Sequence, residues 1–210
     1  MTAEDIAEVV KEFLKERGLE LSEEKTRITH IDDGFDFLGW NFRKYREKLL
    51  IKPSKKSIEK VTRKISDVIK KAKAWKQEDL INALNPIIIG WSNYHRSVVS
   101  KEVFSKLDNI VWNMLWRWAK RRHPEKNSKT RIARKYWHSD GTRNWVFSTK
   151  KNRLKRFSDT KIVRHIGLKM DKNPYLDLEY FKLRKLRQKA LKLRDWYKTR
   201  WDKLKDGLCA

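Results

Sequence analysis

The sequence predicts a mainly α-helical protein with one small β-hairpin, in which a helical bundle is flanked by a short N-terminal segment and a basic, mixed C-terminal region. Apolar residues recur at helical spacing in several segments, and one short stretch alternates apolar with polar residues after an Asp-Asp-Gly turn. Of the 210 residues, 39% are hydrophobic and 38% are charged. This composition provides enough apolar material for a core and enough charge to cover it.

Residues 3–17 are predicted to form an amphipathic helix. Thr2 is a possible N-cap, and acidic residues fill the first turns, where the helix dipole favours negative charge. The apolar residues at helical spacing are Ile6, Val9, Val10, Phe13 and Leu14. Such a face needs a partner surface to cover it.

A β-hairpin is predicted after the turn at residues 32–34. Phe35 and Phe37 alternate with polar residues, and a Leu-Gly pair provides a tight connection to the second strand. We expect Phe37 and Leu38 to belong to the core.

Three amphipathic helices with short links are predicted next. The first covers residues 58–72, with apolar side chains on one face and Lys or Arg on the other sides. The second covers about residues 80–94 and contains Pro86, which either kinks the helix or starts a new one. The third runs from about Lys101 to Arg121. Consecutive helices of this kind form a small bundle.

The helical pattern weakens after residue 124. A turn is predicted at residues 140–141 and a short strand at 145–147, and folded structure is expected as far as about residue 148. Residues 150–205 hold 20 Lys/Arg against 6 Asp/Glu, and residues 178–204 are compatible with a densely basic helix.

The charge is unevenly distributed along the chain. The formal net charge is +25, yet residues 1–40 hold 5 Lys/Arg and 11 Asp/Glu, which leaves 47 of the 52 basic and 16 of the 27 acidic residues for the remainder. A field of this size attracts polyanions through counterion release, so nucleic acid is the expected partner. No membrane partner is expected, because no apolar run reaches the length of a spanning helix and the N-terminus does not resemble a signal peptide.

The cysteine content is also informative. The single cysteine, Cys209, excludes a disulfide framework, so the expected location is the cytoplasm, or more generally a bacterial or organellar interior.

Three segments resemble group II intron reverse transcriptases, the intron-encoded maturases. They are LELSEEKTRITHIDDGFDFLGW at residues 19–40, GWSNYHR at 90–96 and VWNMLWRWAKRRHP at 111–124. The resemblance implies the C-terminal part of such a protein, with the last palm elements at residues 1–51 and the thumb, or domain X, at 52–124. A basic nucleic-acid-binding region would follow at 125–205, and 206–210 would be the stub of a missing HNH endonuclease.

The resemblance and the residue chemistry together suggest binding residues. A primer and template strand would contact Lys25, Arg27 and Gly39, although a surface strand explains the first two equally well, and Gly39 would let a backbone come close. Intron RNA would bind residues with planar donors or stacking surfaces, and residues at a helix start that suits phosphate. The resemblance adds two cations beyond domain X. Together these residues are Lys52, Ser54, Lys55, Lys56, Asn93, His95, Arg96, Arg117, Lys120, Arg121, Arg122, Arg131 and Lys135.

The basic C-terminal region is expected to bind target DNA. Its predicted contact residues are Arg153, Lys155, Arg156, Arg164, His165, Arg184, Lys185 and Arg187.

No catalytic residue and no cofactor are expected in this chain. Asp32, Asp33 and Asp36 invite a two-metal interpretation, but ordinary turn chemistry explains them better. The family's catalytic aspartates lie in a Tyr-Ala-Asp-Asp motif, which the sequence lacks, and one cysteine cannot build the nuclease's metal site. Mg²⁺ is expected only for the parent RNA-directed DNA polymerase and for the intron RNA.

The interpretation that follows is a nucleic-acid-binding part of a maturase, which binds intron RNA to assist splicing and retrohoming. Two alternatives stay open. The chain could complete a split RNA-directed DNA polymerase whose fingers and palm are a separate polypeptide, or it could be a degenerate remnant that binds nucleic acid nonspecifically.

Overall fold

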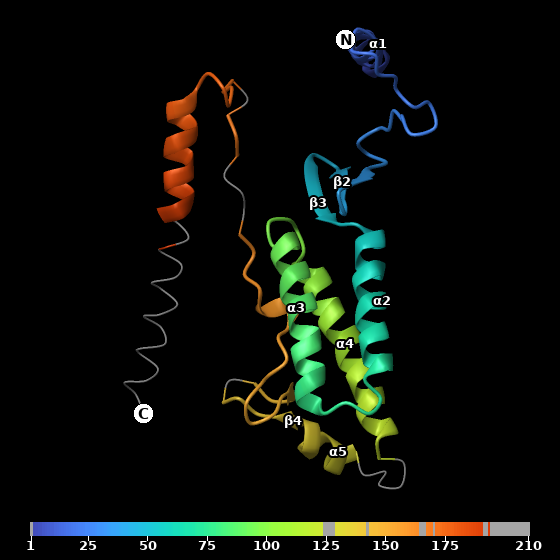
Figure 1. Ribbon diagram of the computed structural model, residues 1–210, viewed down its shortest axis with the longest axis vertical. Helices are drawn as coiled ribbons and strands as arrows, with labels where there is room; N and C mark the ends of the chain where they lie inside the picture. Colours follow the sequence, from blue (N-terminus) through green and yellow to red (C-terminus); the bar gives the residue numbers. More distant parts are fainter. Residues whose placement is uncertain are drawn as a thin grey trace. The chain divides into compact units, whose positions relative to one another are not determined.

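The computed structural model describes residues 2–123, 129–141, 143–163, 167–169, 171–190 and 193. These residues fall into two compact units, Met1–Arg164 and His165–Ala210. The elements of the first unit (Figure 1) are α1 (Ala3–Lys15), β1 (Phe35–Phe37), β2 (Trp40–Tyr45), β3 (Lys48–Pro53), α2 (Lys55–Lys71), α3 (Gln77–His95), α4 (Lys101–Arg121), α5 (Lys129–Tyr136), β4 (Trp137–His138), β5 (Val146–Phe147) and the 3₁₀-helix η1 (Phe157–Asp159). The mainly α-helical fold with a small β component is confirmed.

Helix α1 forms as predicted, and its N-terminus is capped. The Thr2 hydroxyl accepts a hydrogen bond from the Asp5 amide, and the Asp5 carboxylate accepts one from the Thr2 amide. This is a capping box, which satisfies amide groups that the first turn leaves free. No residue of α1 is buried, so its apolar face is exposed in this chain.

The predicted hairpin is larger in the structure, where it forms a three-stranded antiparallel sheet in the order β1-β2-β3. Phe37 pairs with Trp40, and the two residues between them, Leu38 and Gly39, both have positive φ, at 48° and 80°. This is the geometry of a type I′ turn, in which glycine is favoured because it has no Cβ. The third strand starts after a turn at residues 46–47, where Arg46 also has positive φ.

The bundle consists of α2, α3 and α4, which lie side by side (Figure 1). Helix α3 is continuous through Pro86, so of the two predicted alternatives the start of a new helix there is wrong. Leu84 and Ile88 on either side of the proline are buried in the same core, and this packing stabilises the helix on both sides of it. Helix α4 has the predicted bounds, Lys101 to Arg121.

The core of the bundle extends beyond the predicted boundary at residue 124. Ile132 and Tyr136 of α5, Trp137 of β4, Phe147 of β5 and Phe157 of η1 are buried in the same cluster as the helices. Strands β4 and β5, which lie before and after the predicted turn at Asp140-Gly141, pair with each other. The basic region predicted to begin at residue 125 therefore starts as part of the bundle.

A buried carboxylate fastens η1 to the bundle. Asp108 of α4 accepts hydrogen bonds from the amides of Phe157, at 2.8 Å, and Ser158, at 3.1 Å. Arg156 lies 3.6 Å from the same carboxylate. Burying a charge is costly unless it is paired and hydrogen-bonded, and Asp108 has both kinds of partner.

The second unit contains a helical stretch at residues 178–190, within the predicted range 178–204; the rest of that range, except residue 193, lies outside the described residues. Asp177 precedes it and accepts hydrogen bonds from the Asn173 amide and from the Lys172 ammonium. Both contacts favour the ionised carboxylate, so they lower the pKa of Asp177, with the backbone hydrogen bond as the larger cause.

Candidate nucleic-acid interface

A hydrogen-bonded network joins the sheet to the bundle. The Trp40 indole donates to Nδ1 of His95 at 3.0 Å, and Nε2 of His95 lies 3.1 Å from the Ser57 hydroxyl. The Trp91 indole also donates to that hydroxyl, at 3.2 Å. Because Nδ1 accepts a hydrogen bond from the Trp40 indole, the neutral imidazole must carry its own proton on Nε2. Burial disfavours the charged imidazolium and lowers the pKa of His95 to about 4.

Two predicted RNA contacts belong to this interior network. His95 is 1% exposed and Ser54 is 2% exposed. Ser54 is the N-cap of α2, and its hydroxyl accepts the amide hydrogen of Ser57. The structure contradicts a direct contact of Ser54 or His95 with RNA, because neither side chain reaches the surface and both already have partners.

The tight turn of the sheet rests on the bundle. The Tyr94 hydroxyl donates to the Leu38 carbonyl at 2.6 Å, the Ser54 amide donates to the Gly39 carbonyl, and the Trp40 and Tyr94 rings stack at 5.2 Å. A Cβ added to Gly39 would meet Ser57 and Tyr94, so this glycine faces the bundle rather than open space. The expectation that Gly39 admits a nucleic-acid backbone is not supported by this placement.

The prediction that Phe37 and Leu38 are core residues is wrong. Phe37 is 57% exposed and Leu38 is 66% exposed. The pairing of Phe37 with Trp40 places Leu38 in a tight turn whose backbone contacts the bundle, while the side chains of Phe37 and Leu38 face solvent. Of the other predicted contacts near this end, Lys25 and Arg27 are exposed outside any strand.

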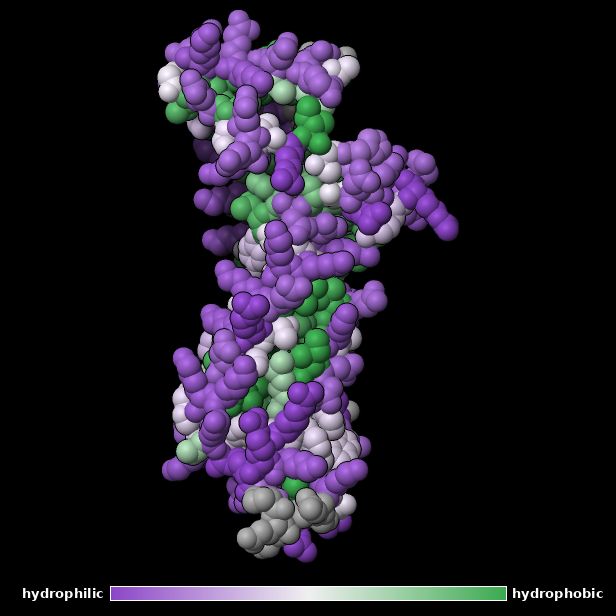
Figure 2. All heavy atoms as spheres, turned by 90° about the vertical axis from the view of Figure 1, so that its right-hand side faces the viewer, coloured by the Kyte–Doolittle hydropathy of each residue, from purple (hydrophilic) through white to green (hydrophobic). Residues whose placement is uncertain are grey.

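The outer side of α2 carries a row of exposed cations, which we name the basic face. It consists of Lys60, Arg63, Lys64, Lys70 and Lys71. The apolar residues Val61, Ile65 and Ile69 point into the core, so the helical period places the cations on the solvent side. Figure 2 shows that hydrophilic side chains cover much of the side on which α2 lies in Figure 1. Asp67 interrupts the row and lies 3.8 Å from Lys70.

The basic face borders a groove between α2 and α3. The groove has a volume of about 330 Å³, and its floor includes Pro86 and Gly90 of α3. Lys60 and Lys64 stand at its α2 edge, and Trp91 lines the opposite wall. The absence of a side chain at Gly90 keeps the groove open. A phosphate chain that followed the groove would pass two lysines on the α2 side and Trp91 on the α3 side.

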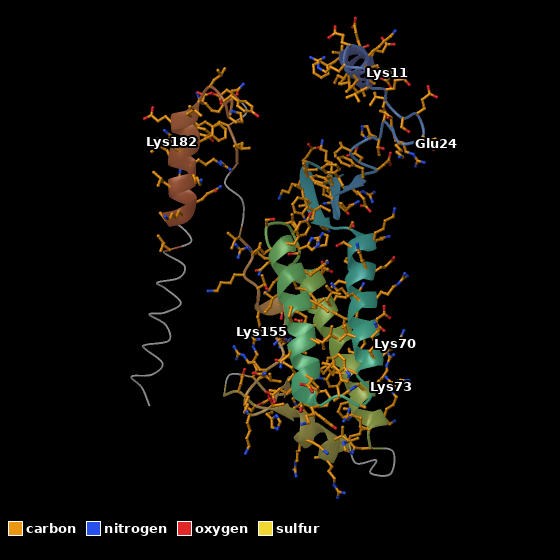
Figure 3. All side chains as sticks on the ribbon, in the orientation of Figure 1. Lys11, Glu24, Lys70, Lys73, Lys155 and Lys182 are labelled. Carbon is orange, nitrogen blue, oxygen red and sulfur yellow. The ribbon has the colours of Figure 1, made fainter. Side chains whose placement is uncertain are left out.

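Further cations gather where the ends of α2 and α4 meet. The Trp118 indole donates to the Ala72 carbonyl at 2.8 Å, and the Arg122 guanidinium donates to the carbonyls of Lys73 and Trp75. Arg122 also lies over the Trp118 ring, so it is engaged in holding the helix ends together rather than free for RNA. Figure 3 labels Lys70 and Lys73 on the outer side of this end of the bundle.

The remaining predicted RNA contacts differ in exposure. Lys52 is partly buried, with its ammonium 4.9 Å from the centre of the Tyr45 ring, and Arg96 is half-buried. The others are exposed, on α2, α3, α4 and α5, and they are Lys55, Lys56, Asn93, Arg117, Lys120, Arg121, Arg131 and Lys135. The predicted RNA contacts do not include the basic face, although the spacing of its cations at three or four residues in the sequence already indicated a cationic side of this helix.

The predicted DNA contacts are divided between the two units. Arg153, Lys155 and Arg156 lie beside η1, in the first unit, whereas Arg184, Lys185 and Arg187 lie on the helical stretch of the second. Arg184 donates to the Gly167 carbonyl within that unit. The predicted contacts Arg164 and His165 lie outside the described residues.

In the described part of the chain, no group of three or more His, Cys, Asp or Glu side chains is arranged to hold a metal ion. None of the described helices is long and apolar enough to span a bilayer.

A comparison with known families finds a match that covers most of the bundle. The model of the group II intron, maturase-specific domain matches residues 58–137, a range that runs from the first turn of α2 to the start of β4. No curated protein matches the chain. The match confirms the resemblance that the GWSNYHR and VWNMLWRWAKRRHP segments suggested, and it includes the whole basic face. The chain carries, at residues 58–137, the maturase-specific domain of group II introns.

Proposed function

We propose that this chain binds group II intron RNA through the basic face of its maturase-specific domain and assists splicing by stabilising the folded intron. One observation carries the proposal. Within the segment that matches the maturase-specific domain, five exposed cations follow one side of α2 beside an open groove. Each phosphate that such cations neutralise releases condensed counterions, and this release favours binding.

The chemistry of splicing would belong to the RNA. A protein that binds one folded state of the intron more tightly than the others shifts the population toward that state without taking part in bond breaking. Cations on a rigid helix suit this role, because the buried face of α2 fixes their spacing before the RNA arrives.

The experiment that tests this proposal reverses charge on two matched helices. Lys60→Glu with Lys64→Glu changes two cations of the basic face, and Lys11→Glu with Lys15→Glu makes the same change of charge on α1. We expect the first pair to weaken binding of a group II intron RNA and to reduce the salt dependence by about two contacts, while the α1 pair has a much smaller effect. Equal losses for the two pairs would show that net charge alone governs affinity.

The second unit is proposed to contact target DNA. Its described helical stretch carries Lys182, Arg184, Lys185, Arg187 and Lys189, with Glu179 as the only acidic residue between 178 and 190. Reversing Lys182, Lys185 and Lys189 to Glu should weaken duplex DNA binding more than intron RNA binding. Similar losses for both ligands would assign the unit to nonspecific binding.

A second candidate function is that of a subunit in a split RNA-directed DNA polymerase. The observation that favours it is α1, whose apolar residues Ile6, Val9, Val10 and Phe13 are all exposed in this chain. A separately encoded fingers and palm polypeptide would cover this face. Primer extension that appears only when such a polypeptide is mixed with this chain would favour this function.

A further inference from the structure

An aromatic cavity opens between α4 and the segment that carries β5 and η1. Its volume is about 230 Å³, and its walls include Trp112, Trp137, Trp145, Phe147 and Phe157. Pockets for drug-sized ligands are larger, at roughly 300–1,000 Å³, so this cavity suits a single planar ring. It lies within the first unit, and none of its lining residues belongs to the basic face.

Two tryptophans of the cavity remain open to solvent. Trp112 is 38% exposed and stacks on Trp116 with the ring planes only 4° apart, which fixes its orientation. Trp145 is 57% exposed. An indole that served only the core would be buried, because its large apolar surface gains free energy by leaving water. Rigid, exposed aromatic faces beside a cavity are instead typical of stacking platforms.

The backbone at Trp145 supports the same interpretation. Its φ is 65°, a left-handed conformation that is uncommon for any residue other than glycine. Contacts on both sides maintain it, because Asp140 and Arg143 form the preceding turn and Val146 pairs with His138. Strained residues of this kind cluster at binding sites, where the surrounding structure holds a side chain in a position that it would not otherwise adopt.

The cavity has a cationic rim. A neighbouring hollow of about 350 Å³ shares Val146, Leu154, Lys155 and Arg156 with it. Arg143 and Arg153 also line this hollow, and they are oriented by ion pairs with Asp159 and Asp140. The hollow thus holds four cations against two carboxylates of its own lining, and Arg156 also lies 3.6 Å from Asp108, which lines the adjoining cavity. Lys155 forms no ion pair within the part of the chain that the structure describes, and Figure 3 labels it on the side of the bundle away from Lys70.

We propose that this cavity receives one unpaired nucleotide, with its base stacked on Trp112 or Trp145 and its phosphate bound by Arg143, Lys155 and Arg156. An aromatic slot next to a cationic hollow matches a nucleotide, which joins a planar ring to an anion. The proposal rests on the nucleic-acid binding proposed above and adds recognition of a base, which the basic face does not offer. The ligand is an unpaired base of either RNA or DNA.

The test compares each base-bearing strand with an abasic strand of the same sugar and length. Affinity of the full chain is measured by fluorescence anisotropy, at one fixed salt concentration, for labelled oligouridylate, for oligothymidylate and for the abasic ribose and deoxyribose strands. The wild type should bind the base-bearing strands about 5- to 150-fold more tightly than the matching abasic strand, the range expected for one stacked base. A preference for both oligouridylate and oligothymidylate over abasic strands indicates a site that accepts either sugar. A preference for only one of them identifies the nucleotide as coming from RNA or from DNA.

Three variants and one matched control locate the effect. Trp145→Ala and Trp112→Ala should each lose most of the preference for bases, whereas Trp145→Phe should retain it. Trp75→Ala is the control, because Trp75 is also exposed but does not line the cavity. Retention of the full preference in both alanine variants would overturn the proposal, and so would a loss in Trp75→Ala as large as that in Trp145→Ala.

A second measurement does not depend on the folding of any variant. Oligouridylate carrying 5-iodouridine is photocrosslinked to the wild type, and adducts are expected on peptides that contain Trp112 or Trp145. Adducts confined to other peptides would overturn the proposal. If the wild type binds base-bearing and abasic strands equally, the cavity proposal fails alone. If it binds neither strand, the proposed function fails as well.

Discussion

The indole nitrogen of Trp40 donates a hydrogen bond to Nδ1 of His95, and this contact links the sheet to the third helix of the chain. His95 lies at the C-terminal end of α3, while Trp40 begins β2. Because Ser57 of α2 binds the other imidazole nitrogen, one neutral histidine connects a strand and two helices. The network therefore positions the tight turn of the sheet against the groove between α2 and α3.

Removing the Trp40 donor is expected to destabilise the protein. Trp40→Phe keeps an aromatic ring for stacking on Tyr94 but leaves the Nδ1 acceptor of His95 without its partner. A buried unsatisfied polar group costs about 1–3 kcal/mol, so the free energy of unfolding should fall by this amount in urea denaturation. Trp75→Phe, at an exposed position, is the control. A variant as stable as the wild type would show that water replaces the lost donor.

The stability of the protein should depend on the titration of His95. Its folded pKa is about 4, below its ordinary value of 6.5, so between these values the unfolded chain binds a proton that the folded protein does not. The free energy of unfolding must then rise with pH from about 4 to about 6.5, and this contribution is fully present above that range. His95→Gln should flatten this part of the stability profile, while His30→Gln, at an exposed position, should not. Superimposable profiles for wild type and His95→Gln would contradict the neutral network.

The boundary between the two units, after residue 164, can be tested by truncation. A chain ending at residue 164 keeps Phe157, which is fully buried, and should unfold with nearly the midpoint of the full chain. A chain ending at residue 149 loses Phe157 and Leu154, and should be destabilised by at least the roughly 3–5 kcal/mol that deletion of one buried phenylalanine side chain costs. Circular dichroism during thermal unfolding measures both. If the two truncated chains are equally stable, η1 does not contribute to the stability of the core.

Shape-specific RNA binding is predicted to need arginine rather than charge alone. Replacing Arg96, Arg117 and Arg121 by Lys keeps the charge but removes planar stacking and bidentate phosphate contacts. Affinity for a structured group II intron RNA should then fall while affinity for random single strands stays nearly constant, as measured by competition at one salt concentration. Lys60→Arg with Lys64→Arg is the charge-conserving control. If the triple variant keeps its preference for the intron, the arginines bind only through charge.

The chain by itself is predicted to lack polymerase activity. The sequence contains no Tyr-Ala-Asp-Asp motif, and the aspartates at 32 and 33 lie in a turn. Purified chain should therefore show no primer extension on an RNA template with Mg²⁺ or Mn²⁺. Extension that disappears in Asp32→Ala with Asp33→Ala would make these turn residues catalytic.

The sequence alone determined the features that depend on neighbours along the chain. The bounds of α4, the apolar stripe of α2 and the capped α1 were predictable because helical period and capping are local properties. The basic character of the bundle was equally predictable, because the number of charged residues follows from the sequence alone. The resemblance over residues 90–124 also anticipated the maturase-specific domain.

Only the tertiary structure decided which polar residues remain available to a ligand. Ser54 and His95 looked like RNA contacts in the sequence, yet long-range partners bury both, because the type I′ turn brings Trp40 against α3. The sequence left open whether Pro86 kinks the helix or starts a new one, and α3 continues through it with buried residues on both sides. The aromatic cavity depends on the approach of residues 144–157 to α4, which ends at Arg121, a contact between segments more than 20 residues apart in the sequence. Local periodicity carries no information about such contacts, since they depend on how the elements pack.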